Sequence, residues 1–269
     1  MDCNVFYRIS SESYPKPKIP GTTKEICLEN FIRIFGNKIV VVADNCHEPL
    51  LKHMENLRLK IFESNFGNSG SFRHALQMAV SLPPESLVYF VEDDYLHLQS
   101  APQLLTEAIH YADYVTLYDH PDKYGPMYDG GEVSKVFRTT SSHWRFSQST
   151  TMTFAAQVKT LRADFQEWMA GTENQHPDDH GTFTLLGEKK QRTLAVSVPG
   201  VACHTDLTYS THVGHNTMEE WAVEQALGYL LWQLEPEASS VVDNMRRAGM
   251  TKLQQAACLE ELLKKKKDK

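Results

Sequence analysis

The sequence lacks the features that mark several large protein classes. No apolar run approaches the roughly 20 residues that a membrane-spanning helix needs. The first ten residues, MDCNVFYRIS, have no basic stretch followed by an apolar one, so a signal peptide is not expected. The five cysteines are odd in number and form no CxxC pair: Cys3, Cys27, Cys46, Cys203 and Cys258. This usage favours reduced thiols in a cytoplasmic protein over a disulfide framework or a zinc knuckle.

Positive charge is also scarce. The chain has 27 Lys and Arg against 34 Asp and Glu, which gives a formal net charge of -7 at pH 7. A broad nucleic-acid interface needs a basic face, so we expect no nucleic-acid partner. The exception is the C-terminal run KKKKDK. We interpret this run as a solvated helix end, with weak contact to an anionic membrane surface as the alternative.

Three catalytic motifs are absent: the GxSxG elbow, the GxxxxGK[ST] phosphate loop and the GxGxxG dinucleotide loop. A serine hydrolase, a P-loop ATPase and a Rossmann dehydrogenase therefore have no support. The composition itself is that of a globular protein, with 41% hydrophobic and 23% charged residues. A chain of 269 residues can form one large domain, or one domain with an appendage.

Strand-like and helix-like patterns alternate over residues 1–119. We expect strands over 4–10, 38–44, 59–64, 87–94 and 113–119, and helices over 22–35, 47–57, 72–82 and from Ser100 onward. The run KIVVVAD is typical of a strand that is buried on both faces of a parallel sheet. This alternation predicts βα units and a mostly parallel sheet, that is, an α/β fold.

The pattern changes after residue 119. Residues 120–151 lack sustained periodicity and predict loops with short strands, and two further strands are expected over 150–156 and 194–203. Residues 218–235 and 240–265 look helical. We therefore expect a main domain over residues 1–216 and a helical extension, residues 217–269, packed on the same domain.

Three consecutive carboxylates, Glu92, Asp93 and Asp94, follow the apolar run LVYFV. In parallel α/β sheets, ligands bind beyond the carboxyl ends of the strands. Clustered hard oxygen ligands at such an end suit Mg²⁺ or Mn²⁺ with positions open for phosphate oxygens. On an extended backbone Glu92 and Asp94 would point to one side and Asp93 to the other. The alternative is a strand that ends in solvent with exposed acids.

Two more features are expected at the same edge of the sheet. Asp44 ends the second strand, where it would accept hydrogen bonds from a ribose or a base, or would simply begin a turn. Gly67 and Gly70 bracket a predicted turn before a helix, whose first N–H groups could hold an anion or the edge of a base. A plain glycine-rich turn explains that composition equally well.

The ordered series YRIS, VVADN, GNSGS and VYFVEDDYLH resembles the family-2-like glycosyltransferases of GT-A fold. With TLYDHPDKY, GGEVSKVFRT, SSHWRFSQSTTMTF, HPDDH and PGVACHTDLT, it is most similar to the capsid-glycan glycosyltransferases of large algal viruses. The resemblance implies a Rossmann-like, mostly parallel sheet flanked by helices. It also implies a metal-dependent, inverting enzyme that moves a sugar from a nucleoside-diphosphate donor, with UDP as the expected nucleotide, to a hydroxyl of a glycan acceptor.

The resemblance also implies roles for single residues. Asp94 is the first choice as a ligand of Mn²⁺ or Mg²⁺, with Glu92 and with His204 of VACHTD. Asp93 would serve the sugar or the outer shell of the metal. The nucleotide would be bound by residues that follow the early strands, namely Arg8, Asp44, Asn68 and Ser71.

The catalytic base is expected in HPDDH, because inversion needs a carboxylate that takes the proton of the acceptor hydroxyl. Asp179 is our choice and Asp178 the alternative, although Asp178 would also serve as a helix cap. Trp144 would stack on a sugar or lie in the core, and Arg138 would neutralise diphosphate charge or lie on the surface.

Two other functions stay open. A nucleotidyltransferase would use a similar sheet and metal, but SYPKPKIPG has prolines where a glycine-rich GxGxR-type phosphate loop would be expected. A non-catalytic protein that binds sugars or nucleotides on a transferase fold is the other alternative.

Overall fold

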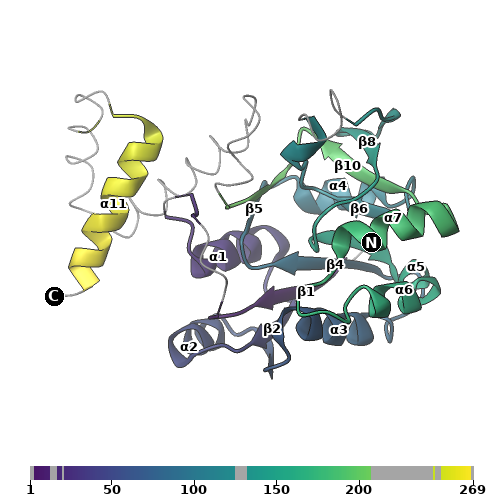
Figure 1. Ribbon diagram of the computed structural model, residues 1–269. Coiled ribbons are helices and arrows are strands. Elements are labelled where there is room, and N and C mark those ends of the chain that lie inside the picture. The colour runs from purple at the N-terminus through teal and green to yellow at the C-terminus, as the bar shows by residue number, and fades with distance from the viewer. Residues whose placement is uncertain are drawn as a thin grey trace.

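The computed structural model describes residues 3–12, 17–19, 21–124, 132–206, 245 and 250–267. Nine strands form one sheet in the order β3-β2-β1-β4-β9-β6-β10-β8-β7 (Figure 1). They are β1 (Cys3–Ile9), β2 (Val40–Asp44), β3 (Lys60–Ser64), β4 (Leu87–Glu92), β6 (Tyr114–Thr116), β7 (Val136–Arg138), β8 (His143–Ser147), β9 (Phe154–Gln157) and β10 (Leu194–Val198). Only β8 and β9 run against their neighbours in this sheet, so the predicted mostly parallel sheet is confirmed.

A second, two-stranded sheet lies beyond the end of β4. It pairs β5 (Tyr95–His97) with β11 (Ala202–His204) in antiparallel register, with Tyr95 opposite His204. The single strand predicted over 194–203 is therefore two strands. Pro199 separates them, because proline has no N–H with which to continue a ladder. The second strand brings His204 beside the acidic run.

Helices cover both faces of the large sheet. One face packs on α1 (Lys24–Phe35), α2 (Glu48–Asn56) and α4 (Ala101–Ala108), and the other on α3 (Gly67–Ala79), α5 (Val158–Ala163), α6 (Phe165–Ala170) and α7 (Asp179–Lys190). Successive residues of β1 serve opposite faces, since Tyr7 belongs to the first core and Phe6 to the second. The predicted α/β fold, with a Rossmann-like central sheet between helices, is confirmed.

Two helices begin elsewhere than predicted. Thr23, rather than Thr22, caps α1, because its hydroxyl accepts the N–H of Ile26 at 3.4 Å. The helix α3 begins at Gly67, and the predicted turn over 67–71 is its first turn. Gly67 has a φ of 74°, a conformation that favours glycine.

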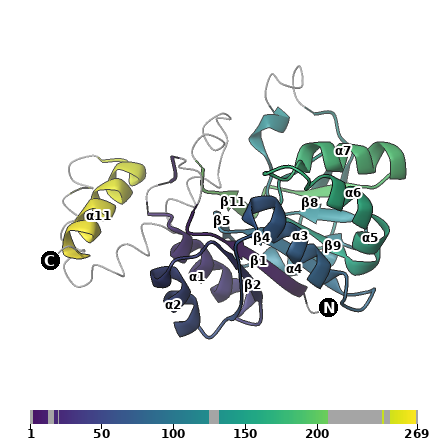
Figure 2. The ribbon, with the colours of Figure 1, turned by 60° about the horizontal axis from the view of Figure 1, so that its bottom comes forward.

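The C-terminal helix α11 (Lys252–Lys267) lies at the end of the molecule opposite α5 and α6 (Figures 1 and 2). It contacts the rest of the chain, because Glu260 Oε2 accepts the backbone N–H of Gly21 at 3.1 Å and Leu259 is buried. The helix predicted over 240–265 is thus confirmed from Lys252 on, whereas 218–235 lies outside the described residues. None of the helices in the described ranges is long and apolar enough to cross a membrane.

Candidate functional site

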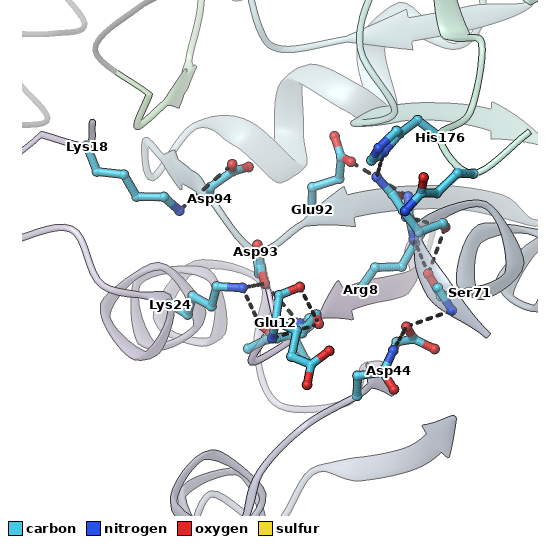
Figure 3. A pocket seen from close by; sticks show the side chains of 16 residues that line it. Arg8, Glu12, Lys18, Lys24, Asp44, Ser71, Glu92, Asp93, Asp94 and His176 are labelled. Atoms are coloured by element: carbon cyan, nitrogen blue, oxygen red, sulfur yellow. Dashed lines mark hydrogen bonds and ion pairs between the residues drawn. The ribbon is translucent and has the colours of Figure 1, made fainter. Parts of the chain in front are cut away.

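A cleft of about 680 Å³ opens at the carboxyl ends of β1, β2 and β4 (Figure 3). Its size is in the range of small-molecule sites, roughly 300–1,000 Å³. The cleft is lined by Arg8, Ile9, Ser10, Glu12, Lys18, Lys24, Asp44, Asn45, Gly67, Asn68, Ser71, Glu92, Asp93, Asp94, Gln175 and His176. The predicted nucleotide-binding residues and the acidic run therefore meet in one place.

Each acid of the run faces a different basic side chain. Glu92 Oε1 lies 3.7 Å from Arg8 Nη1, Asp93 Oδ2 lies 2.8 Å from Lys24 Nζ, and Asp94 Oδ2 lies 3.9 Å from Lys18 Nζ. Figure 3 shows the Lys18–Asp94 pair on one side of the cleft and the Arg8–Glu92 side on the other. We call these six residues the pocket cluster. Part of the positive charge that three adjacent carboxylates require thus comes from the protein itself.

Arg8 is buried and is held mainly by α3. It lies directly opposite Glu92 in the β1–β4 register, and its Nη2 donates to both the backbone and the side-chain oxygen of Asn68. Its Nε donates to Ser71 Oγ at 3.3 Å. Its Nη1 is buried without a hydrogen-bond partner in the described part of the chain. A buried guanidinium N–H that lacks an acceptor is costly, and an anionic oxygen is the group that would satisfy it.

The fold strongly shifts the pKa of Glu92. Burial raises the pKa of Glu92 to about 7, against the lowering effect of Arg8. The carboxylates of Asp94 and Asp179 also raise this pKa. The influence of Asp179 places the HPDDH segment within electrostatic range of the acidic run, as a shared site requires.

Two of the three predicted metal ligands meet. His204 Nε2 lies 3.2 Å from Asp94 Oδ2, because the β5–β11 pairing and the bond from Thr205 N to Asp94 O set these residues side by side. Across the described ranges, no three His, Cys, Asp or Glu side chains are grouped so as to hold a metal ion. Glu92 does not complete the site in this geometry. An imidazole and a carboxylate are nevertheless a donor pair that fits Mn²⁺, with substrate oxygens filling the other positions.

The structure gives Asp44 a different task from ribose binding. Its Oδ1 accepts from Phe66 N at 2.6 Å and Ser64 Oγ at 2.8 Å. Its Oδ2 accepts from Gly67 N and from Asn45 Nδ2, both at 3.0 Å. A carboxylate has about four acceptor positions, so the protein already uses those of Asp44. The same bonds occupy N–H groups at the start of α3, where an anion or a base edge was predicted.

The two acids of HPDDH are separated by their roles in α7. Asp178 is the N-cap, and its Oδ1 accepts the N–H of Gly181 at 2.8 Å. Asp179 is half-buried, and its Oδ1 accepts the adjacent N–H of His180 at 2.7 Å. Burial raises the pKa of Asp179, and so does Asp178, while His120 and His180 lower it. A raised pKa strengthens the tendency of this carboxylate to accept a proton.

Trp144 and Arg138 do not line this cleft, and neither do His204, Asp178 and Asp179. Complete burial overturns the sugar-stacking role predicted for Trp144. Trp144 is fully buried in the core, where its indole N–H donates to Thr139 Oγ1 at 3.0 Å. Arg138 ends β7, the edge strand of the sheet, and is exposed. An indole of this size packs as readily in a core as on a sugar, and the sequence alone does not separate the two.

Several cleft residues were missed by sequence reasoning. Lys24 opens α1, and Lys18 belongs to the proline-rich loop before it. His176 lies within HPDDH, and its Nδ1 is 3.4 Å from Asn68 Nδ2. The sequence held one indication of the two lysines. Each follows the first strand closely in the chain, and the three acids require positive charges nearby.

Comparisons with known proteins find similarity to solved structures. No family model matches the sequence, and no curated protein matches it. The structure of S. aureus TarS 1-349 is 16% identical over 73% of this chain and 58% of that chain, with a TM-score of 0.43. The chain thus spans less than two thirds of that protein.

Two further structures are similar along most of their own length. The galactosyltransferase LgtC in complex with donor and acceptor sugar analogs is 9% identical over 83% of this chain and 95% of that one, with a TM-score of 0.47. The CMP:2-keto-3-deoxy-manno-octonic acid synthetase complexed with CTP is 10% identical over 75% and 93%, with a TM-score of 0.45. At such identities and scores, the argument about function rests on the cleft itself.

Proposed function

We propose that this protein is a GT-A glycosyltransferase that moves a sugar from a nucleoside-diphosphate donor, UDP-linked, to a hydroxyl of a glycan. The observation that carries the proposal is the composition of one cleft at the carboxyl ends of parallel strands. The cleft is lined by Arg8, whose buried Nη1 has no hydrogen-bond partner among the described residues, and by Asp94, which lies 3.2 Å from His204. The first group suits a phosphate oxygen, and the second suits a divalent cation beside it.

A Mn²⁺ or Mg²⁺ ion is part of this proposal. Asp94 and His204 would hold it, and the ion would offset the negative charge that develops on the departing diphosphate. Arg8 would add a fixed donor for the same charge, because its other N–H groups are anchored to Asn68 and Ser71. Donors that are already oriented need no reorganisation during the reaction.

The acceptor side of the proposal rests on Asp179. Its carboxylate would take the proton of the attacking hydroxyl, which is the role that inversion requires of a base. Burial raises the pKa of Asp179 and so makes it a stronger base. Asp178 caps the N-terminus of α7 through its bond to Gly181, and this fixed helix end holds Asp179 in place.

A donor screen tests this function. The full chain would be incubated with UDP-, GDP-, TDP- and CMP-sugars, with and without Mn²⁺, and the release of free nucleotide would be followed. We expect slow, Mn²⁺-dependent release of UDP from at least one UDP-sugar, and its loss in the Asp94→Asn variant. Pyrophosphate released from a nucleoside triphosphate and a sugar phosphate would instead identify a nucleotidyltransferase. Binding without any turnover would identify a non-catalytic protein.

A further inference from the structure

The two lysines of the cleft hold their acids in different ways. Lys24 Nζ lies 2.8 Å from Asp93 Oδ2 and also donates to the backbone oxygen of Ser10. It thereby ties α1 to the ends of β1 and β4. Lys18 Nζ lies 3.9 Å from Asp94 Oδ2, which is beyond the roughly 2.7–2.9 Å of a charge-assisted hydrogen bond. Lys24 is thus held by hydrogen bonds, whereas Lys18 and Asp94 interact through their charges without a hydrogen bond.

The backbone keeps Lys18 next to Asp94 whether or not that contact is made. Residues 17–19 lie along the segment after β11, with a bridge between Lys18 and Asp206 and a 2.9 Å bond from Ile19 N to Thr205 O. Thr205 N in turn donates to Asp94 O at 2.9 Å. Because the backbone is fixed, the four-carbon stem of Lys18 can carry its ammonium to another partner within the cleft.

A cation bound at the proposed metal site would disturb this pair. The ion would share Asp94 with His204, and it would carry the same sign of charge as the Lys18 ammonium beside it. Lys18 and the metal therefore compete for one carboxylate. A diphosphate at the metal would offer the displaced ammonium a new anionic partner, because phosphate oxygens and ammonium groups pair as point charges.

We infer that Lys18 is a donor-binding residue that exchanges partners: it pairs with Asp94 without ligands and with the donor diphosphate once metal and nucleotide are bound. This inference rests on the proposed function. It assigns the proline-rich loop before α1 a role in donor recognition, in place of the glycine-rich loop that the sequence lacks. It also makes metal and nucleotide binding mutually supportive, since each helps to release Lys18 from Asp94.

The exchange of partners predicts that one variant binds Mn²⁺ more tightly and UDP more weakly. Lys18→Met keeps the apolar stem and removes the charge. We expect Mn²⁺ alone to bind about 3-fold more tightly or better, because its competitor is gone. We expect UDP at saturating Mn²⁺ to bind about 5-fold more weakly or worse, because a phosphate partner is gone. Free Mn²⁺ is measured by electron paramagnetic resonance and UDP binding by calorimetry.

Matched controls separate the exchange from a loss of structure. Lys159→Met removes another lysine of an ion pair, 3.0 Å from Glu85 and exposed, and should change neither affinity. Lys18→Arg should restore most of the UDP affinity. Circular dichroism and the melting temperature establish that each variant folds.

Three results would overturn the inference. If Lys18→Met lowers the affinity for both Mn²⁺ and UDP, Lys18 only supports the shape of the site. If it changes neither affinity, Lys18 does not take part in binding. In both cases the wild type still binds UDP, and the proposed function stands. If the wild type binds no UDP with any divalent ion, the proposed function fails, and the donor role of Lys18 fails with it.

Discussion

Two groups of charged residues in this molecule are built on opposite principles. Around Asp164, which is fully buried, every oxygen is paired at short range. Its Oδ2 accepts from Arg192 Nε and Tyr114 OH, both at 2.8 Å, and its Oδ1 accepts from Arg192 Nη2 at 3.0 Å and Lys190 Nζ at 3.3 Å. We call these four residues the Asp164 cluster. It ties the end of α7 to β6 and leaves no acceptor position for a ligand.

The pocket cluster is paired loosely by comparison. Two of its ion pairs span 3.7 and 3.9 Å, and Arg8 Nη1 is buried without a hydrogen-bond partner in the described residues. Burial also raises the pKa of Glu92 to about 7. Charges buried without short partners cost stability, and a fold that keeps them at the mouth of a cleft has them available for a ligand. This is the difference expected between charges that hold a fold together and charges that bind a ligand, in line with the proposed function.

The largest effect is expected for Asp179, whose charge raises the pKa of Glu92 in the pocket cluster. Asp179→Asn removes the proposed base and should slow transfer about 10²–10⁴-fold. UDP–Mn²⁺ affinity and the melting temperature should stay near wild type, because this carboxylate holds no element of the fold together. Initial rates with the donor found in the screen measure the effect.

The neighbouring acid is the matched control for this variant. Asp178→Asn retains a capping side chain and should keep most of the activity, since asparagine also caps helices well. A dead Asp178→Asn together with an active Asp179→Asn would move the base by one residue and contradict our assignment.

The Asp164 cluster should respond in the opposite way. Asp164→Ala leaves the buried Tyr114 hydroxyl without its acceptor, whereas Arg192 keeps Asp113 and Lys190 keeps Glu167. It should lower the free energy of unfolding by about 1–3 kcal/mol. The folded fraction should still bind UDP. Urea denaturation measures the loss, and Lys159→Met, an exposed ion pair, should stay within roughly 0.5 kcal/mol of wild type. A loss below about 1 kcal/mol in Asp164→Ala would remove the contrast between the clusters.

A smaller effect is expected from the ionisation of Glu92. Its pKa in the folded protein is raised from 4.5 to about 7, so the folded state holds a proton there that the unfolded state has already lost. The free energy of unfolding should therefore fall as pH rises from about 4.5 through 7, by about 1 kcal/mol or more. Glu92→Gln should remove this part of the pH dependence. Urea denaturation of the metal-free protein at pH 5 and pH 8 tests it, and equal pH dependence in both proteins would contradict it.

The parts that the sequence predicted are those set by local pattern. The strand that ends at Glu92, its neighbour that ends at Asp44, and the helix α2 follow from apolar runs and turn residues close by in the chain. Their parallel arrangement then brings Arg8 and the acids to one edge. Local sequence patterns did not predict which buried side chains pair with one another.

The site features that the sequence did not predict depend on partners from distant segments of the chain. Asp44 is satisfied by backbone groups more than 20 residues later, at Phe66 and Gly67, so its role as a cap cannot be read from VVADN. Lys18 reaches Asp94 because its segment pairs with residues near 205. The sequence predicts only loops with short strands around Trp144, so it does not say which face of β8 is buried.

Calorimetric titration of UDP, with and without Mn²⁺, into the wild type and Asp94→Ala tests the central claim most directly. The claim is that the loosely paired charges of this cleft are a binding site for a nucleoside diphosphate and a divalent ion. The account predicts that the wild type binds UDP only weakly without Mn²⁺, and that Asp94→Ala loses at least tenfold in affinity when Mn²⁺ is present. Equal UDP affinity in both proteins, unchanged by Mn²⁺, would contradict it.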